Sequence, residues 1–151
     1  KPETIKSQFY SLLSEYFDVP TIGRFALGRY WKSVSDDQKE EYIDLFRTMI
    51  VEIYASRFEG YTNEKVEIVS SRSLNKRDVL VSSQLVFADN RAPIPLEWRV
   101  RNVDGQPKII DLVVEGVSMS VTQRSDFNSV MQRADGNVNE LLNKMREKYV
   151  K

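Results

Sequence analysis

Residues 21–31 read TIGRFALGRYW and place two glycines, Gly23 and Gly28, inside an otherwise aromatic and apolar run. Pro20 precedes this run, and a long stretch with helical periodicity follows it. A glycine within a helix is less favourable than an alanine by about 1 kcal/mol. Two glycines in one short helix therefore predict close packing against a neighbouring element or a bend.

The overall composition limits the classes of function. A chain of 151 residues predicts one domain, residues 1–151, with enough length to bury a core. Lys and Arg number 22, as do Asp and Glu, and this balance argues against a nucleic-acid partner. No apolar run is long enough to cross a bilayer. The polar start at Lys1 is expected of a cytosolic protein or of one whose signal peptide has been removed.

The chain contains no histidine and no cysteine. Catalytic triads that depend on histidine, the usual zinc sites and disulfides are therefore excluded. Gly-rich phosphate loops and dinucleotide fingerprints are also missing from the sequence. Only carboxylate, lysine, tyrosine or serine chemistry remains for catalysis, and we expect no metal and no cofactor.

The first 60 residues have helical patterning. Residues 4–17 carry one apolar face, Pro20 is expected to break the chain, and Thr21 is expected to cap a second helix. Ser35 and Gln38 have the spacing of a capping box for a third helix, which we expect to end near Gly60. The apolar stripe of this third helix consists of Tyr42, Leu45, Phe46, Met49, Ile50, Ile53 and Tyr54.

The middle of the chain has strand patterning. Residues 66–69 and 79–87 are rich in β-branched side chains, residues 94–100 alternate, and Asp104 with Gly105 predicts a hairpin turn before residues 108–115. We expect Gly116 to bend or bulge a strand that continues through residue 121.

Helical patterning returns near the C-terminus. We expect one helix to start at Ser125 or Asp126 and end at Gly136, and another to be capped by Asn137. The predicted fold is α+β: a curved antiparallel sheet of about four strands, with the N- and C-terminal helices packed on one face.

Two separated blocks of sequence resemble a known family. The first block runs from Tyr16, Phe17 and Asp18 through LGRYW at residues 27–31 to Gln38, Phe46 and Tyr54. The second contains Asp111, EGVS at residues 115–118, Arg124 and Phe127. In this order they resemble the periplasmic MlaC/toluene-tolerance family of phospholipid-binding transport proteins. The chain departs from the family at Pro107, where a tryptophan is usual.

The resemblance implies a cystatin/NTF2-like sheet under a helical layer, with an apolar cavity for phospholipid tails between them. It implies a monomeric carrier, with its signal peptide removed, that moves glycerophospholipids between the inner and outer membranes of the envelope and maintains outer-membrane lipid asymmetry. The implied partners are a two-chain phospholipid, an inner-membrane ABC transporter complex with its MCE-domain subunit, and an outer-membrane lipoprotein–porin complex. No enzymatic activity is implied, and phospholipid would be the bound ligand.

The apolar stripes are typical of an ordinary core, and only the resemblance makes some of their members candidates for the cavity wall. Arg29 is a weak candidate for contact with a lipid headgroup, and we favour an ion pair with Asp18 or Asp111 instead. The candidate cavity-lining residues are Ile22, Phe25, Ala26, Phe46, Met49, Ile50, Ile53, Tyr54, Leu85, Leu96, Trp98, Val100, Ile110, Leu112, Val114, Val117, Met119, Val130, Leu141, Leu142 and Met145.

Two alternatives stay open at this point. A small NTF2-like enzyme acting on an apolar substrate would need a polar dyad, for which Asp111 with Tyr30 or Tyr54 is the best candidate. The Gly-x-Ser fragment ending at Ser118 is a weak hydrolase signal without a histidine. The other alternative is an interaction domain with a filled core.

Overall fold

The computed structural model describes residues 2–54 and 64–150 and has an α+β architecture, as the sequence predicts. The elements in chain order are α1 (Pro2–Tyr16), α2 (Val19–Leu27), the 3-10 helix η1 (Gly28–Ser33), α3 (Asp36–Tyr54), β1 (Lys65–Ser73), β2 (Asp78–Val86), β3 (Ile94–Val103), β4 (Gln106–Val114), β5 (Val117–Ser118), α4 (Met119–Arg133) and α5 (Val138–Tyr149). The position expected for the end of α3, Gly60, lies outside the described residues.

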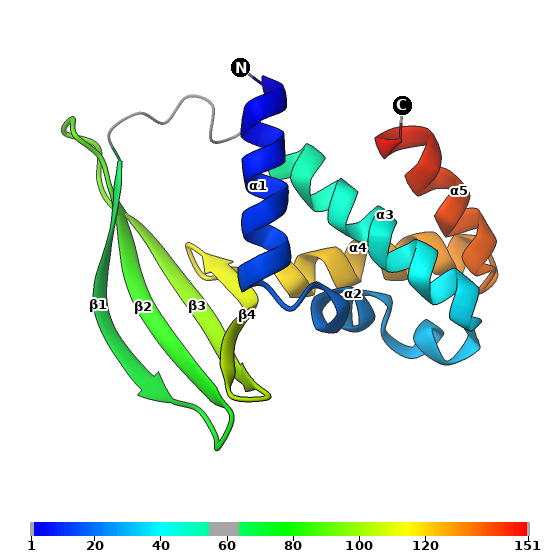
Figure 1. Ribbon diagram of the computed structural model, residues 1–151, viewed down its shortest axis with the longest axis horizontal. Coiled ribbons are helices and arrows are strands. Elements are labelled where there is room, and N and C mark those ends of the chain that lie inside the picture. Colours follow the sequence, from blue (N-terminus) through cyan, green and yellow to red (C-terminus); the bar gives the residue numbers. More distant parts are fainter. Residues whose placement is uncertain (1, 55–63, 151) are drawn as a thin grey trace.

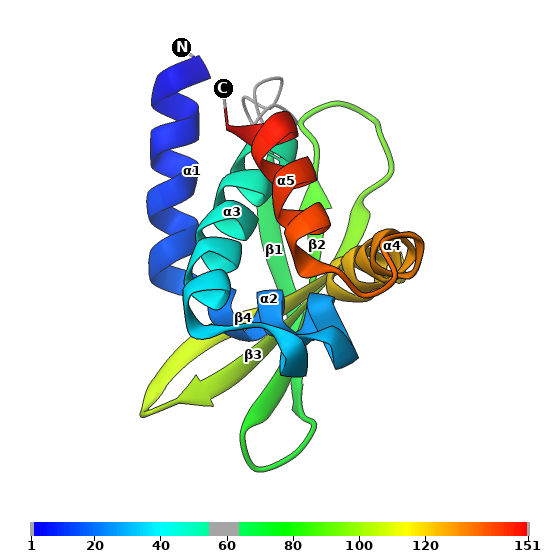
Figure 2. The same ribbon diagram turned by 90° about the vertical axis from the view of Figure 1, so that its right-hand side faces the viewer.

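The five strands form one antiparallel sheet in the order β1-β2-β3-β4-β5, one strand more than the sequence predicts. The additional strand, β5, has only two residues. Figure 1 shows the helices gathered beside β4, while β1 and β2 lie furthest from them. In Figure 2, α1, α3 and α5 lie next to one another. Together with α2 and α4, which contact them and each other, they form the helical layer.

The helical layer has its own core. Tyr42, Phe46 and Phe127 meet in edge-on and tilted ring contacts with centroids 5.9–6.1 Å apart. Met131 and Leu142 complete its most buried part, with no more than 1% of the side chain of either exposed. The hydroxyl of Tyr42 donates a 2.6 Å hydrogen bond to the carbonyl of Gly23, and burial raises the pKa of Tyr42 well above its ordinary value. This hydrogen bond ties α3 to α2.

The two glycines of residues 21–31 have different roles, and only Gly23 lies inside α2, since that helix ends at Leu27 and Gly28 is its C-cap. Gly23 is buried inside α2, where an added Cβ would lie 2.9 Å from Cδ1 of Ile43. Gly28 has a φ of +60°, and its N–H donates to the carbonyls of Arg24 and Phe25. Gly23 therefore allows α2 to approach α3 closely, and Gly28 ends α2 with a bend into η1.

The predicted N-terminus of α2 is wrong by three residues. Asp18, and not Thr21, is the N-cap: its carboxylate accepts hydrogen bonds from the N–H and the hydroxyl of Thr21 at 3.2 and 2.7 Å. Pro20 lies in the first turn of the helix. Proline is tolerated there because the N–H that it lacks has no partner within the helix.

The role predicted for Gly116 is also wrong in part. Glu115 and Gly116, with φ of 51° and 83°, form a tight turn between β4 and β5 and not a bulge in one long strand. Residues 119–121, expected in that strand, form the first turn of α4, which begins well before Ser125. The cause is Ser118, whose hydroxyl accepts a hydrogen bond from the N–H of Val121 and caps the helix.

Other local predictions are confirmed. Ser35 and Gln38 form the reciprocal capping box, with hydrogen bonds of 2.9 and 3.2 Å. Asp104 and Gly105 both have positive φ in the β3–β4 turn, and Asn137 caps α5. Each of these features needs only the residue's own chemistry and that of its near neighbours in the chain.

A buried ion cluster links β2 to β3 on the sheet face opposite Trp98. Asp78 has 1% of its surface exposed and accepts hydrogen bonds of 2.6–3.0 Å from Arg99 and Arg101. The hydrogen bond from Arg101 is the largest cause that lowers the pKa of Asp78, and Arg99 adds to it against the opposing effect of burial. The carboxylate is therefore held in its charged form.

We expect Asp78→Asn to lower the free energy of unfolding by about 3 kcal/mol, because it leaves two guanidinium groups without their anion. Since the folded pKa of Asp78 lies below its ordinary value of 3.8, its contribution is complete above about pH 4 and is lost as the pH falls through the folded value. Urea unfolding at several pH values should show the gap between wild type and variant narrowing in acid. Asp89→Asn, which removes an exposed partner of Arg91, is the control and should have little effect. A gap that stays constant with pH contradicts this role of Asp78.

Candidate functional site

A cavity of about 240 Å³ lies between the helices and the inner strands of the sheet. Its walls come from α1, α2, α3, α4, β3 and β4, together with the α1–α2 junction. The lining residues are Phe9, Leu12, Leu13, Phe17, Val19, Ile22, Phe46, Ile50, Tyr54, Trp98, Asp111, Leu112, Met119, Ser120 and Gln123. Eleven of these fifteen side chains are aliphatic, thioether, phenylalanine or tryptophan groups, so the walls are apolar.

The sheet contributes one cross-strand pair to the wall, together with Asp111 of β4. Trp98 on β3 lies opposite Leu112 on β4, so the two side chains share a face of the sheet. The indole N–H of Trp98 donates a 2.9 Å hydrogen bond to the hydroxyl of Ser83, which itself donates to the carbonyl of Leu96 at 2.8 Å. The indole nitrogen of Trp98 therefore has its hydrogen-bond partner outside the cavity wall.

Asp111 is the one acidic residue among those that line the cavity, and both of its carboxylate oxygens accept hydrogen bonds. One oxygen accepts from the N–H groups of Leu112 and Ser120 at 2.8 and 3.0 Å. The other accepts from the hydroxyl of Ser118 at 2.5 Å. These hydrogen bonds join β4 to the first turn of α4, where the helix dipole favours a negative charge. The arrangement is that of a structural clamp.

Seven of the candidate residues come together in the lining: Ile22, Phe46, Ile50, Tyr54, Trp98, Leu112 and Met119. Five others belong to the sheet outside this lining: Leu85, Leu96, Val100, Ile110 and Val114. Seven belong to the core of the helical layer or pack against it: Ala26, Met49, Ile53, Val130, Leu141, Leu142 and Met145. Lipid contact stays a prediction for all of these residues.

The last two candidates lie on the surface. Phe25 is 40% exposed, and the guanidinium of Arg124 lies 4.8 Å from the centre of its ring. Val117 is 55% exposed in β5, next to the Glu115–Gly116 turn. Neither side chain is part of the cavity wall.

The wall also includes residues that sequence reasoning did not assign to it. They are Phe9, Leu12, Leu13, Phe17, Val19, Ser120 and Gln123. The apolar face of α1 is visible in the sequence as a helical pattern, but periodicity does not say what that face covers. Ser120 and Gln123 gave no signal, because the residues around them were expected in a strand.

The expected ion pair of Arg29 with Asp18 or Asp111 is wrong. Among residues 2–54 and 64–150, the partner of Arg29 is Tyr30, whose hydroxyl accepts a 2.8 Å hydrogen bond from the guanidinium. The guanidinium carbon also lies 4.9 Å from the centre of that ring. Asp18 and Asp111 are occupied by the caps of α2 and α4. Neither Arg29 nor Tyr30 lines the cavity.

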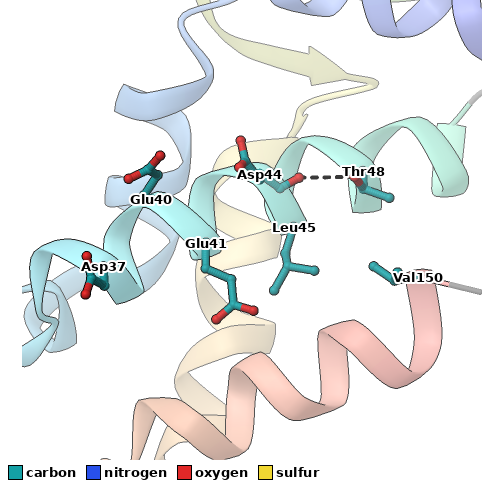
Figure 3. A pocket seen from close by; sticks show the side chains of 7 residues that line it. All are labelled: Asp37, Glu40, Glu41, Asp44, Leu45, Thr48 and Val150. Carbon is teal, nitrogen blue, oxygen red and sulfur yellow. Dashed lines mark hydrogen bonds between the residues drawn. The ribbon is translucent and has the colours of Figure 1, made fainter.

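A second hollow has acidic walls and lies between α3 and the end of α5. Figure 3 shows its lining residues, which are Asp37, Glu40, Glu41, Asp44, Leu45, Thr48 and Val150. Arg146 donates two 2.6 Å hydrogen bonds to Glu41 and thereby lowers the pKa of that carboxyl. Across the described part of the chain, no group of three or more acidic side chains is placed to hold a metal ion.

No helix within residues 2–54 and 64–150 is long and apolar enough to cross a bilayer.

Comparisons with known proteins agree on one family. A family model described as MlaC protein matches residues 1–147. The chain is similar to the intermembrane phospholipid transport system binding protein MlaC of Haemophilus influenzae, with 28% identity over 149 residues, 97% of this chain and 69% of that protein. It is also similar to the toluene tolerance protein ttg2D of Pseudomonas putida, with 20% identity over 105 residues. That match spans 70% of this chain and 48% of the Pseudomonas protein.

A solved structure has the same fold. It is a phospholipid-binding protein from Ralstonia solanacearum in complex with a phospholipid, with a TM-score of 0.83 and 22% sequence identity. The match covers 97% of this chain and 85% of that one.

The clamp at Asp111 makes a quantitative prediction. Asp111→Ala and Ser118→Ala should each lower the free energy of unfolding by about 1–3 kcal/mol, because each removes a charged hydrogen bond or the cap of α4. The double variant should lose less than the sum by about 1 kcal/mol or more, since both changes break the same hydrogen bond. Urea unfolding of the four proteins measures this coupling. Strictly additive losses contradict the clamp.

Proposed function

Because this chain belongs to the MlaC protein family, we propose that it binds a two-chain glycerophospholipid by its acyl chains, in the cavity between the helices and the sheet. The observation that carries this proposal is the apolar wall around about 240 Å³ of space. An apolar cavity of about 150 Å³ already binds benzene in another protein. Each methylene removed from water contributes about 0.8 kcal/mol, so acyl chains are the ligands that gain most here.

The cavity as it stands is smaller than the roughly 300–1,000 Å³ typical of ligand pockets. More apolar surface continues on the same face of the sheet, where Ile68 and Val66 of β1 are 74% and 51% exposed. Exposed apolar patches of this kind are typical of binding sites. We infer that acyl carbons that do not fit in the cavity cover this face beyond Trp98, and that the helices and strands separate further when both tails are bound.

The proposed role is transport. Two acyl chains of ordinary length contribute on the order of 20 kcal/mol before entropy and cavity costs, so lipid escapes slowly into water. Release then requires contact with a partner, and we propose the inner-membrane ABC transporter complex with its MCE-domain subunit and the outer-membrane lipoprotein–porin complex. The carrier acts as a monomer in the periplasm and helps to maintain outer-membrane lipid asymmetry. The headgroup stays largely outside, because the polar wall residues are few.

The position of Asp111 argues against the rival enzyme. A general base must accept a proton from the substrate, and Asp111 already accepts hydrogen bonds from Leu112, Ser118 and Ser120, which fill three of the roughly four acceptor positions of a carboxylate. Of its two candidate tyrosine partners, Tyr54 lines the cavity and Tyr30 does not. The cavity itself argues against an interaction domain with a filled core.

Lipid mass spectrometry of the protein purified from a Gram-negative host and then denatured tests the proposal. We expect two-chain phospholipid in a stoichiometric amount. A protein that is empty after purification, and that takes up no phospholipid from vesicles, overturns the proposal. Turnover of a small apolar substrate that is lost in Asp111→Asn would instead support the enzyme.

A charge placed in the wall should remove the lipid. Ile50 lies in the wall on α3, and Ile50→Lys should reduce the bound lipid at least about tenfold, because a buried charge facing acyl chains is costly. Val121→Lys adds the same charge at a position that is 56% exposed and outside the wall, so its lipid content should stay at the wild-type level. Circular dichroism of both variants checks that they are folded. Equal lipid content in Ile50→Lys and Val121→Lys contradicts this site.

A further inference from the structure

Trp98 is the cavity-lining residue nearest to the outer strands of the sheet. The sheet supplies lining residues from β3 and β4, while β1 and β2 supply none. On the far side of Trp98 the same face continues through its partner Val81 on β2 and then to β1. Exposure increases on this face toward β1: Leu112 and Trp98 are half-buried, whereas Ile68 of β1, which pairs with Ser83 of β2, is 74% exposed. The indole therefore stands between the cavity and a more exposed apolar face.

The ring is held in this position by one hydrogen bond. Trp98 pairs with Val81 in the register, but its indole N–H reaches diagonally to the hydroxyl of Ser83, at 2.9 Å. Ser83 is only 4% exposed, and its hydroxyl donates a hydrogen bond to the carbonyl of Leu96. A buried indole N–H needs an acceptor, and this serine supplies one on β2. The plane of the ring is thereby fixed across the gap between β3 and β2.

We propose that Trp98, oriented by Ser83, is a partition that limits the bulk of the acyl chain accepted by the inner cavity. The inference rests on the proposed lipid-binding function. Removing the ring joins the cavity to the space over β2, so longer or bent chains gain apolar contacts that the wild-type wall denies them. Each further methylene that leaves water changes the affinity about fourfold. Ser83 acts here as a positioning residue, since it contacts the ring and not the cavity.

Competition between two lipids that share a headgroup tests the partition. Delipidated protein is incubated with vesicles of equal dimyristoyl and dioleoyl phosphatidylglycerol, and the bound lipids are quantified by mass spectrometry. Trp98→Ala should shift the bound ratio toward the dioleoyl lipid at least about fourfold relative to wild type. Trp98→Phe and Ser83→Ala should shift it in the same direction by less, because the first leaves a smaller ring and the second leaves the ring without its acceptor.

Trp31→Phe is the matched control, because Trp31 packs edge-on against Tyr42 in the helical core and is not in the wall. Its bound ratio should equal that of wild type. If Trp98→Ala fails to fold, the two milder variants decide the question. Lipid bound by all variants at an unchanged ratio overturns the partition and leaves the proposed function intact. A wild-type protein that binds neither lipid overturns both.

The fluorescence of Trp98 gives an independent readout. In the Trp31→Phe background, Trp98 is the only tryptophan left in the chain. Phosphatidylglycerol with brominated acyl chains should quench the emission of Trp98, because bromine quenches tryptophan fluorescence only at short range. Lipid brominated in the headgroup should leave the emission unchanged. Quenching by neither lipid, under conditions where mass spectrometry detects bound lipid, places the chains away from Trp98 and contradicts the partition.

Discussion

The carboxylate of Asp111 connects the two layers of the molecule. It lies on β4 and accepts hydrogen bonds from the hydroxyl of Ser118 and the N–H of Ser120. These bonds fix the short β4–β5 turn against the start of α4. Ser118 uses its own oxygen to accept from Val121, so one chain of hydrogen bonds runs from the sheet into the helix. Two residues with positive φ, Glu115 and Gly116, make the reversal sharp enough for these groups to meet.

The attachment is confined to one side of the sheet. The helices contact the sheet mainly through β4 and β5, while β1, β2 and β3 contact chiefly the other strands of the sheet (Figure 1). The helical layer is stable in this position because it has a separate core around Tyr42 and Phe46. A sheet held along one edge leaves apolar side chains of its outer strands without cover, and apolar surface of this kind is unfavourable in water. The proposed acyl chains are ligands that provide this cover.

The two family blocks that the sequence suggested meet in space. Gly28 of the first block has no side chain, and this leaves room for Arg124 of the second block. A Cβ added to Gly28 would lie 3.2 Å from Nε of Arg124. Phe127 of the second block packs on Tyr42 and Phe46. The residues that carry the resemblance therefore hold α2, α3 and α4 together, and the cavity forms beside them. These contacts join residues that are far apart in the chain.

The sequence by itself determined the fold class, most of the elements and the family. Helical and alternating patterns, the capping box at Ser35 and Gln38, and the Asp104–Gly105 turn depend on near neighbours in the chain, so they can be read without the structure. The start of α4 could not be read in this way, because the alternation through Val121 predicts a strand. The helix is favoured by the Ser118 cap and by the hydrogen bond of Ser118 to Asp111 on β4. The tertiary structure alone decided which apolar residues face the cavity. Ile50 and Met49 are neighbours in one stripe of α3, yet Ile50 lies in the wall and Met49 in the helical core. Hydrophobic periodicity reports that a face is apolar, but what covers that face is set by how far apart the two layers stand.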